Sequence, residues 1–78
     1  MSKNFSVRQI DTVATGQWLQ QLRKENGLTI AQLQNLFGFS SASRIMRWER
    51  GLALPSVRCL SALASLYGVK IDDIIVYI

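Results

Sequence analysis

Residues 27–51, GLTIAQLQNLFGFSSASRIMRWERG, decide the fold of this chain. Two short helical patterns stand in this stretch, and a glycine follows each of them. In the first, Thr29 and Gln32 have the spacing of a capping box, in which each side chain bonds the backbone N–H of the other residue. Apolar residues then recur every three or four positions up to the next glycine, and the second pattern spans residues 42–50. We therefore predict two helices joined by a short polar turn.

The second of these predicted helices has a narrow apolar edge and a basic outer face. Ile45 and Trp48 lie three positions apart, which places both on one side of a helix. Between residues 44 and 58 the chain holds four arginines and a single acid, within a net charge of +4 for the whole chain. A generic three-helix core would explain the apolar spacing equally well, but it would not require charge to concentrate here. The combined pattern is typical of a helix-turn-helix.

Further helices are expected on both sides of this pair. An amphipathic pattern runs from Asp11 or Thr15 to Asn26, and another is capped by Ser56 after a proline. Glycine adopts the left-handed backbone conformation at no steric cost, so the glycines after these four patterns predict helix ends. They are Gly27, Gly38, Gly51 and Gly68. With a last short helix near the C-terminus, the chain is predicted to be all-α, a compact domain of five helices.

Both ends of the chain carry residues that favour β-structure. The tail from Ile74 to Ile78 is almost wholly apolar, and Phe5, Val7 and Ile10 could supply a partner strand. We expect the last short helix at roughly residues 72–75 and a short β-pair between the termini. So small a domain can hardly bury every side chain of the tail, which makes the tail a candidate dimer interface.

The length and composition allow one small domain. With 78 residues, 49% apolar and 18% charged, the chain is too hydrophobic to be disordered, and its longest apolar run is far shorter than the ~20 residues that span a bilayer. We divide it into an N-terminal extension over residues 1–10 and a domain over residues 11–78. Because residues 1–10 lack the apolar stretch of a signal peptide, we expect a cytoplasmic protein with no membrane association.

The inventory of reactive side chains argues against an enzyme. The chain has no histidine and one cysteine, Cys59, so an intrachain disulfide is excluded and no Cys/His set is available for a zinc site. Asp72 and Asp73, the only adjacent acids, would point to different sides of a helix, and no glycine-rich phosphate loop is present. We therefore expect no catalytic residue, no metal and no cofactor, and we assign the cysteine no function.

A set of positions spread over residues 14–75 shares its spacing with a known family. These positions are Leu22-Arg23, Gly27-Leu28-Thr29, Leu33, Gly38-Phe39-Ser40, Ile45, Trp48-Glu49-Arg50-Gly51, Pro55-Ser56, Leu63-Ala64 and Gly68-Val69. On them the chain resembles the Cro/repressor-type helix-turn-helix (XRE) family of bacterial and phage regulators. The resemblance implies a five-helix, lambda-repressor-like DNA-binding domain. The chain has one extra residue between Gly38 and Trp48. In this respect it resembles a subgroup of the family that has a longer turn before the recognition helix.

The resemblance also implies which residues meet DNA. It places Ala42, Ser43, Arg44 and Arg47 of the recognition helix at base edges in the major groove. Arg47 is the strongest candidate, because a guanidinium can bond guanine O6 and N7 together; the alternative is a solvated surface arginine. The residues implied to contact the sugar-phosphate backbone are Ser40, Ser41, Arg50, Ser56 and Arg58.

Several residues in the same region also have structural interpretations. The family pairs Glu49 with the arginine of the first helix, here Arg23, in a partly buried ion pair that orients the helices. Trp48 shares its face with an isoleucine and is expected in the core rather than stacked on a base. Ser40 and Ser41 are expected to cap the recognition helix, a role that can coexist with phosphate binding.

These features lead to an expected function. A sequence-specific double-stranded DNA-binding transcriptional regulator fits them best, most simply a repressor that acts by occupying its site. One recognition helix reads only a few base pairs, so we expect a homodimer on an inverted repeat with half-sites about 34 Å apart, in contact through the tail from Ile74 to Ile78. The alternative from another class is a protein-interaction module, such as an antitoxin or an accessory subunit, that uses the helical scaffold to hold a partner.

Overall fold

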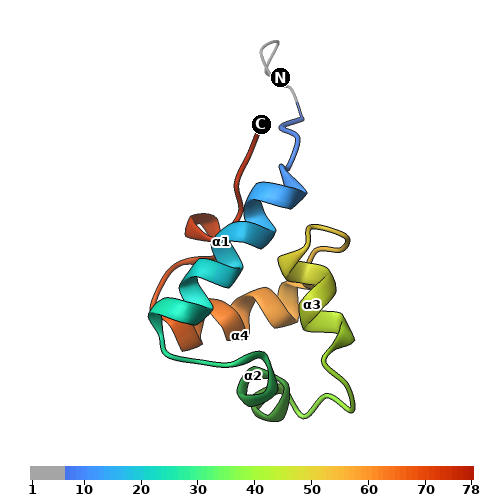
Figure 1. The fold of residues 1–78 in the computed structure, drawn as a ribbon. Coiled ribbons are helices and arrows are strands. Elements are labelled where there is room, and N and C mark those ends of the chain that lie inside the picture. The colour runs from blue at the N-terminus through green and yellow to red at the C-terminus, as the bar shows by residue number, and fades with distance from the viewer. Residues whose placement is uncertain (1–6) are drawn as a thin grey trace.

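The computed structural model describes residues 7–78, and residues 1–6, which hold most of the predicted extension and Phe5, lie outside the described part. Over the described residues the chain is all-α, as predicted, and forms the arrangement drawn in Figure 1. Four α-helices and one 3-10 turn replace the five predicted helices. They are α1 (Thr12–Glu25), α2 (Ile30–Phe37), α3 (Ser43–Glu49), α4 (Val57–Tyr67) and the 3-10 turn η1 (Ile71–Asp73).

The sequence signals for helix starts are confirmed at three helices. The Asp11 carboxylate accepts a hydrogen bond from the backbone N–H of Ala14 at 2.9 Å and begins α1. At the start of α2 the capping box is complete: the N–H of Gln32 donates to the Thr29 hydroxyl at 3.1 Å, and the N–H of Thr29 donates to the Gln32 side chain at 2.9 Å. Ser56 caps α4.

The predicted helix ends are confirmed as well. The four glycines that were expected to follow the helices have φ angles between 68° and 74°, a region that residues with a Cβ rarely enter. Short segments link the helices, and consecutive helices run in different directions (Figure 1).

The core lies between the four α-helices, with Leu19 and Leu22 of α1 among its buried side chains, and the chain that follows α4 closes it. Leu33, Ile45, Leu63 and Ile74 are its fully buried apolar side chains, one each from α2, α3, α4 and the residue after η1. Trp48 is 4% exposed, so its assignment to the core is confirmed. Each helix thus contributes to one shared core, and α3 is held by its inner edge with its outer face free.

The C-terminal segment differs from its prediction. Instead of a helix over residues 72–75, the chain makes one 3-10 turn and then runs extended beside α1. The reason is tertiary: the indole N–H of Trp18 donates to the carbonyl of Asp73 at 2.6 Å, and the N–H of Val76 donates to the hydroxyl of Thr15 at 2.9 Å. These bonds with α1 use backbone groups that a longer helix would need for itself.

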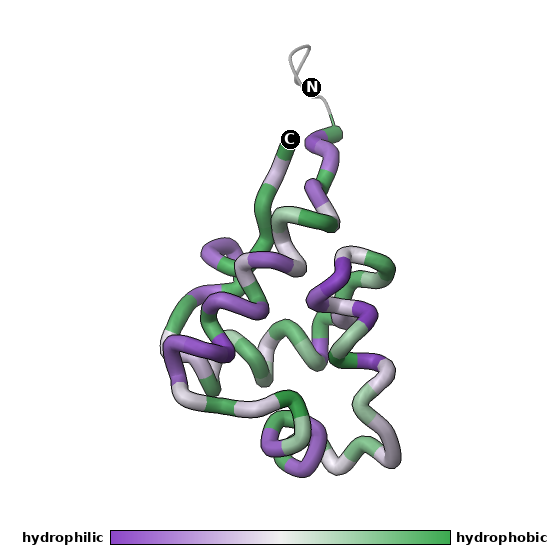
Figure 2. The backbone as a smooth tube through the Cα atoms, in the orientation of Figure 1, coloured by the Kyte–Doolittle hydropathy of each residue, from purple (hydrophilic) through white to green (hydrophobic). Residues whose placement is uncertain are grey.

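The predicted β-pair between the termini is reduced to an isolated antiparallel bridge between Ile10 and Tyr77. Two backbone hydrogen bonds flank it, from the N–H of Asp11 to the carbonyl of Val76 at 2.8 Å and from the N–H of Ile78 to the carbonyl of Gln9 at 2.9 Å. The two termini of the described chain therefore lie side by side, and Figure 2 shows that the C-terminal segment is mainly hydrophobic along its length.

Candidate nucleic-acid interface

An aromatic cluster fixes the angle between α2 and α3. Phe37 ends α2 and Phe39 begins the turn, and their rings stack with centroids 5.1 Å apart. Both rings meet the buried Trp48 of α3 edge-on, at 5.8 and 5.9 Å. Aromatic pairs in these geometries are favourable beyond the apolar area that they bury. The turn between the two helices is consequently packed against α3 on its inner side.

The outer face of α3 is a basic stripe. Ser43, Arg47 and Arg50 are all exposed and follow one another at intervals of four and three residues, so they project from the same side at the helical repeat of about 100° per residue. The opposite side carries the buried Ile45 and Trp48. A helix held by one edge with exposed arginines along the other has the shape and charge needed to enter the major groove of DNA.

The ion pair between Arg23 of α1 and Glu49 of α3 braces this helix from behind. Arg23 Nε donates to Glu49 Oε2 at 2.8 Å and Nη2 donates to Oε1 at 3.0 Å, so the contact is bidentate, and both side chains are less than 10% exposed at 8% and 6%. Arg23 Nη1 also donates to the carbonyl of Leu28 at 2.8 Å, at the start of the helix-turn-helix. The hydrogen bonds that Arg23 donates to the Glu49 carboxylate raise the pKa of its guanidinium further above its ordinary value.

Arg44 does not lie on the basic stripe. Its guanidinium carbon sits 4.3 Å from the centroid of the Phe39 ring, so the side chain is stacked on the turn instead of extending from the outer face. Ala42, the residue before α3, is half-buried. Of the four residues assigned to base edges from the sequence, Ser43 and Arg47 share the stripe, whereas Arg44 and Ala42 lie to its sides.

The turn serines do not cap α3 in the way predicted. The cap position falls on Ala42, which makes no side-chain cap bond. Ser41 Oγ is 2.8 Å from Ser43 Oγ and accepts a long bond of 3.4 Å from the N–H of Ser43, and Ser40 is exposed. Because the cap position falls on Ala42, Ser40 and Ser41 lie too early in the chain to reach the N–H groups that a capping serine bonds.

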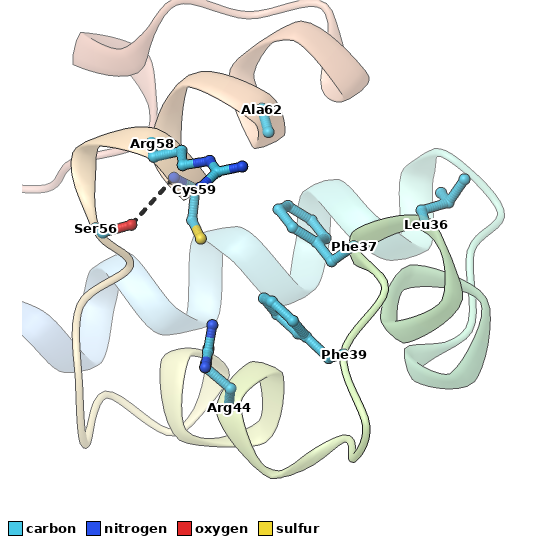
Figure 3. A pocket seen from close by; sticks show the side chains of 8 residues that line it. All are labelled: Leu36, Phe37, Phe39, Arg44, Ser56, Arg58, Cys59 and Ala62. Atoms are coloured by element: carbon cyan, nitrogen blue, oxygen red, sulfur yellow. Dashed lines mark hydrogen bonds between the residues drawn. The ribbon is translucent and has the colours of Figure 1, made fainter.

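Two of the remaining predicted contacts, Ser56 and Arg58, line one groove beside α3. Ser56 and Arg58 at the start of α4 line one wall and Arg44 lines the other, with Phe37 and Phe39 between them, as Figure 3 shows. The groove encloses about 490 Å³. Arg50 stands apart from it, at the end of the basic stripe. Sequence reasoning missed Phe39, whose position beside an arginine depends on the path of an irregular turn.

Two other observations concern the described part of the chain. Over residues 7–78, the helices are each too short or too polar to cross a membrane. The same residues bring together no group of three acidic, cysteine or histidine side chains that could hold a metal ion.

Known proteins share this arrangement. A family model described as helix-turn-helix matches residues 19–74, and no curated protein gives a significant match. Among solved structures, the restriction-modification controller protein C.AhdI from Aeromonas hydrophila is similar with a TM-score of 0.70 and 30% sequence identity, over 82% of this chain and 96% of that one. The S. venezulae BldD DNA-binding domain gives 0.69 and 24%, over 83% and 96%.

A second structure of the BldD DNA-binding domain, a crystal structure, aligns with nearly the whole of this chain. It has a TM-score of 0.69 at 23% identity, over 97% of this chain and 100% of that one, which shows a shared fold. The family model covers most of the chain, and the controller protein is 30% identical over the aligned part. This chain therefore belongs to the XRE-type helix-turn-helix family of DNA-binding transcriptional regulators.

Proposed function

We propose that this protein is a sequence-specific repressor that binds double-stranded DNA as a homodimer on an inverted repeat and has no catalytic activity. The exposed stripe of Ser43, Arg47 and Arg50 on α3 carries this proposal, because it offers a side-chain hydroxyl and two guanidinium groups to one groove. Occupying a promoter is the simplest way for a domain without a described ligand site to regulate transcription, and such a protein acts in the cytoplasm.

The contacts divide by type. Ser43 and Arg47 read base edges, and Arg47 pairs with guanine by two hydrogen bonds. Ser40 and Ser41 in the turn, Arg50 at the end of α3, and the start of α4 contact the sugar-phosphate backbone and set the register. All of these residues are exposed, and Ser40 and Ser41 line one depression together with Ser43 of the stripe, which supports this division.

The homodimer is proposed because one helix reads too few base pairs for useful specificity. The tail from Ile74 to Ile78 remains the proposed contact, but its residues contribute unequally. Ile74 is fully buried in its own domain, the next three residues are half-buried, and Ile78 is 82% exposed. Ile78 is therefore the residue of the tail with the most surface left for a second copy.

Selection of bound sequences from a random duplex pool, at near-physiological salt, tests the regulator proposal. The winning duplex is then titrated against a scrambled duplex of equal length. A palindromic winner bound at least ~10³-fold more tightly than the scrambled duplex is the expected result. Equal affinity for both duplexes would contradict sequence-specific regulation.

The dimer contact has a separate test. Ile78→Asp places a charge in the proposed interface without touching the buried part of the tail, and sedimentation should then show the mass fall toward that of a monomer. Leu54→Asp, at an exposed leucine of the segment before α4, is the matched control and should leave the mass unchanged. A loss of mass in the control alone would place the interface beside α4 instead.

One observation favours the alternative of a protein-interaction module. Leu36 is 62% exposed and Leu66 is 39% exposed, and with Phe37 and Ala62 they line a small apolar groove between α2 and α4. Apolar surface of this kind suits a protein partner better than DNA. Under this alternative, selection yields no enriched sequence and a co-purified protein binds tightly, with Leu36→Asp abolishing that binding.

A further inference from the structure

The groove of Figure 3 holds a pair of arginines that approach it from two different helices. Arg44 comes from α3 and Arg58 from the first turn of α4, and Ser56 stands beside Arg58. None of the eight residues that line the groove is acidic. Two guanidinium groups with no carboxylate between them make the mouth of this groove attractive to an anion.

Arg44 is held in place by the turn. Its guanidinium lies over the face of Phe39 at 4.3 Å, and Phe39 is itself fixed by Phe37 and by the buried Trp48. A guanidinium that stacks on a ring keeps the N–H groups at its edge free, and these match the two oxygens of a phosphate. The single ion pair of the described residues joins Arg23 and Glu49, so Arg44 has no carboxylate partner there.

The direction of Arg44 separates it from the residues that face the bases. Around α3 it lies about 100° from Ser43, toward α4, whereas Arg47 lies only about 40° from Ser43. A second depression, lined by Ser40, Ser41 and Ser43, borders the Arg44–Phe39 pair on its other side. The pair therefore forms a ridge between the two depressions, at the edge of the face that is proposed to read DNA.

We propose that Arg44 and Arg58 clamp one backbone phosphate of the bound duplex, and that Phe39 is the positioning residue that holds Arg44 for this contact. The proposal rests on the proposed function and deepens it, since it moves Arg44 from the base-reading set, where the family pattern places it, to the phosphate-binding set. Arg44 then contributes to the affinity for every DNA sequence and does not discriminate between sequences.

The test measures affinities of the full chain for the selected and the scrambled duplex at several salt concentrations. Arg44→Ala should weaken binding to both duplexes by the same factor and reduce the slope of log affinity against log salt by about 1, leaving their affinity ratio unchanged. Lys70→Ala removes one exposed charge beside η1 and is the control, with the slope expected to stay as in the unmodified chain. A base preference that changes only in Arg44→Ala would overturn the clamp.

A double-mutant cycle tests the role of Phe39. Phe39→Leu keeps an apolar side chain but removes the ring face, and it should weaken both duplexes equally. In an Arg44→Ala background the same change should have little further effect, because the group that it positions is gone. A loss of equal size in both backgrounds would show that Phe39 acts only through folding and would overturn its positioning role.

The outcomes keep this proposal separate from the proposed function. If the unmodified chain binds the two duplexes equally, sequence-specific regulation fails, while a uniform loss in Arg44→Ala still supports the clamp. If the unmodified chain discriminates strongly and Arg44→Ala changes neither affinity nor slope, the clamp fails and the regulator proposal stands. Thermal unfolding midpoints of each variant identify any loss of binding that comes from unfolding.

Discussion

The Arg23–Glu49 pair shows how one contact sets the position of α3. The carboxylate of Glu49 accepts two hydrogen bonds from a guanidinium that is itself almost wholly buried. Removing one member of a buried pair leaves the other charge without compensation, which costs far more than the pair contributes on the surface. The pair therefore contributes to folding, although Glu49 lies on the helix that is proposed to meet DNA.

Glu49→Gln should lower the free energy of unfolding by about 3 kcal/mol, because it leaves the buried Arg23 guanidinium without a carboxylate. Glu25→Gln is the control: Glu25 bonds only the exposed Gln21 side chain among the described residues, and its loss should cost less than about 0.5 kcal/mol. Urea unfolding followed by circular dichroism measures both. Equal losses in the two variants would contradict a special role for the buried pair.

Because of Tyr67, at the end of α4, we expect the protein to lose stability at alkaline pH. Burial, and then the negative charge of Glu49, raise the pKa of its hydroxyl to about 12. In the unfolded chain a tyrosine titrates at about 10, so the folded state holds the proton more tightly. The contribution of Tyr67 to the free energy of unfolding is thus fully present below about pH 10 and is lost as pH rises from about 10 to about 12.

Urea unfolding midpoints measured between about pH 8 and pH 12 check this for Tyr67. Tyr67→Phe keeps the ring in the core without an ionisable hydroxyl, so its midpoint should fall less over the same range. A fall of the same size in the variant and the unmodified chain would assign the alkaline loss to other groups.

For single residues, the sequence predicts which side chains lie on the inner and outer faces of α3. It does not predict that Arg44 stacks on Phe39. The buried Ile45 and Trp48 follow from spacing, because a helix repeats regularly. The turn has no such repeat, so nothing in the sequence says which turn residue an arginine of the next helix will meet. The separation of Arg44 from the stripe could be seen only once the path of residues 38–42 was known.

At the scale of elements, capping residues and glycines carry most of the predictable information. They act within a few residues of themselves, which is why the starts and ends of α1, α2 and α4 follow from the sequence. The predicted C-terminal helix is a single 3-10 turn, Ile71–Asp73, because backbone groups of this segment bond Trp18 and Thr15 of α1, 55 and 61 residues away in the chain. Contacts of that range leave no local signal.

The crossing of α1 and α3 depends on Gly16, which no sequence pattern singled out. A Cβ at Gly16 would lie 2.5 Å from the carbonyl oxygen of Trp48 and 2.7 Å from that of Glu49. Backbone atoms of a packed helix cannot move aside as a flexible side chain can, so the two helices would have to separate. Glycine is thus required here for close approach, although it weakens a helix interior.

Gly16→Ala should therefore destabilise the domain by at least about 2 kcal/mol, although alanine is the better helix former. Gln17→Ala, at the exposed neighbouring position, is the matched control and should change the free energy of unfolding by less than about 0.5 kcal/mol. Both values come from urea unfolding. Stabilisation by Gly16→Ala would mean that α1 and α3 do not cross as closely as the structure shows.

At the scale of the whole molecule, the tail from Ile74 to Ile78 has two roles. It closes the core, and it offers the surface that is proposed for the dimer contact. Ile74 is one of the fully buried side chains, and the segment after it lies against α1 through the backbone bonds of Val76. A domain this small buries a limited fraction of its surface, so each core side chain carries a large share of its stability. Folding and the proposed dimer contact thus share one segment, with different residues in each role.

Ile74→Ala should lower the free energy of unfolding by about 2 to 5 kcal/mol, through lost burial and the cavity that remains. Leu52→Ala removes the same number of carbon atoms from a side chain that is 62% exposed, and it should cost less than about 0.5 kcal/mol. Denaturant unfolding at a fixed protein concentration distinguishes them. Comparable losses would show that the Ile74 side chain is not part of the core in solution.

Arg47 offers the most direct test of the claim that α3 reads DNA bases. The measurement is the ratio of dissociation constants for the scrambled and the selected duplex, compared between the unmodified chain and Arg47→Ala at one salt concentration. The ratio should fall by roughly tenfold or more, because a bidentate guanine contact is worth about 1 to 3 kcal/mol, while the thermal midpoint stays nearly constant. An unchanged ratio, with both affinities reduced equally or not at all, would contradict base reading by α3.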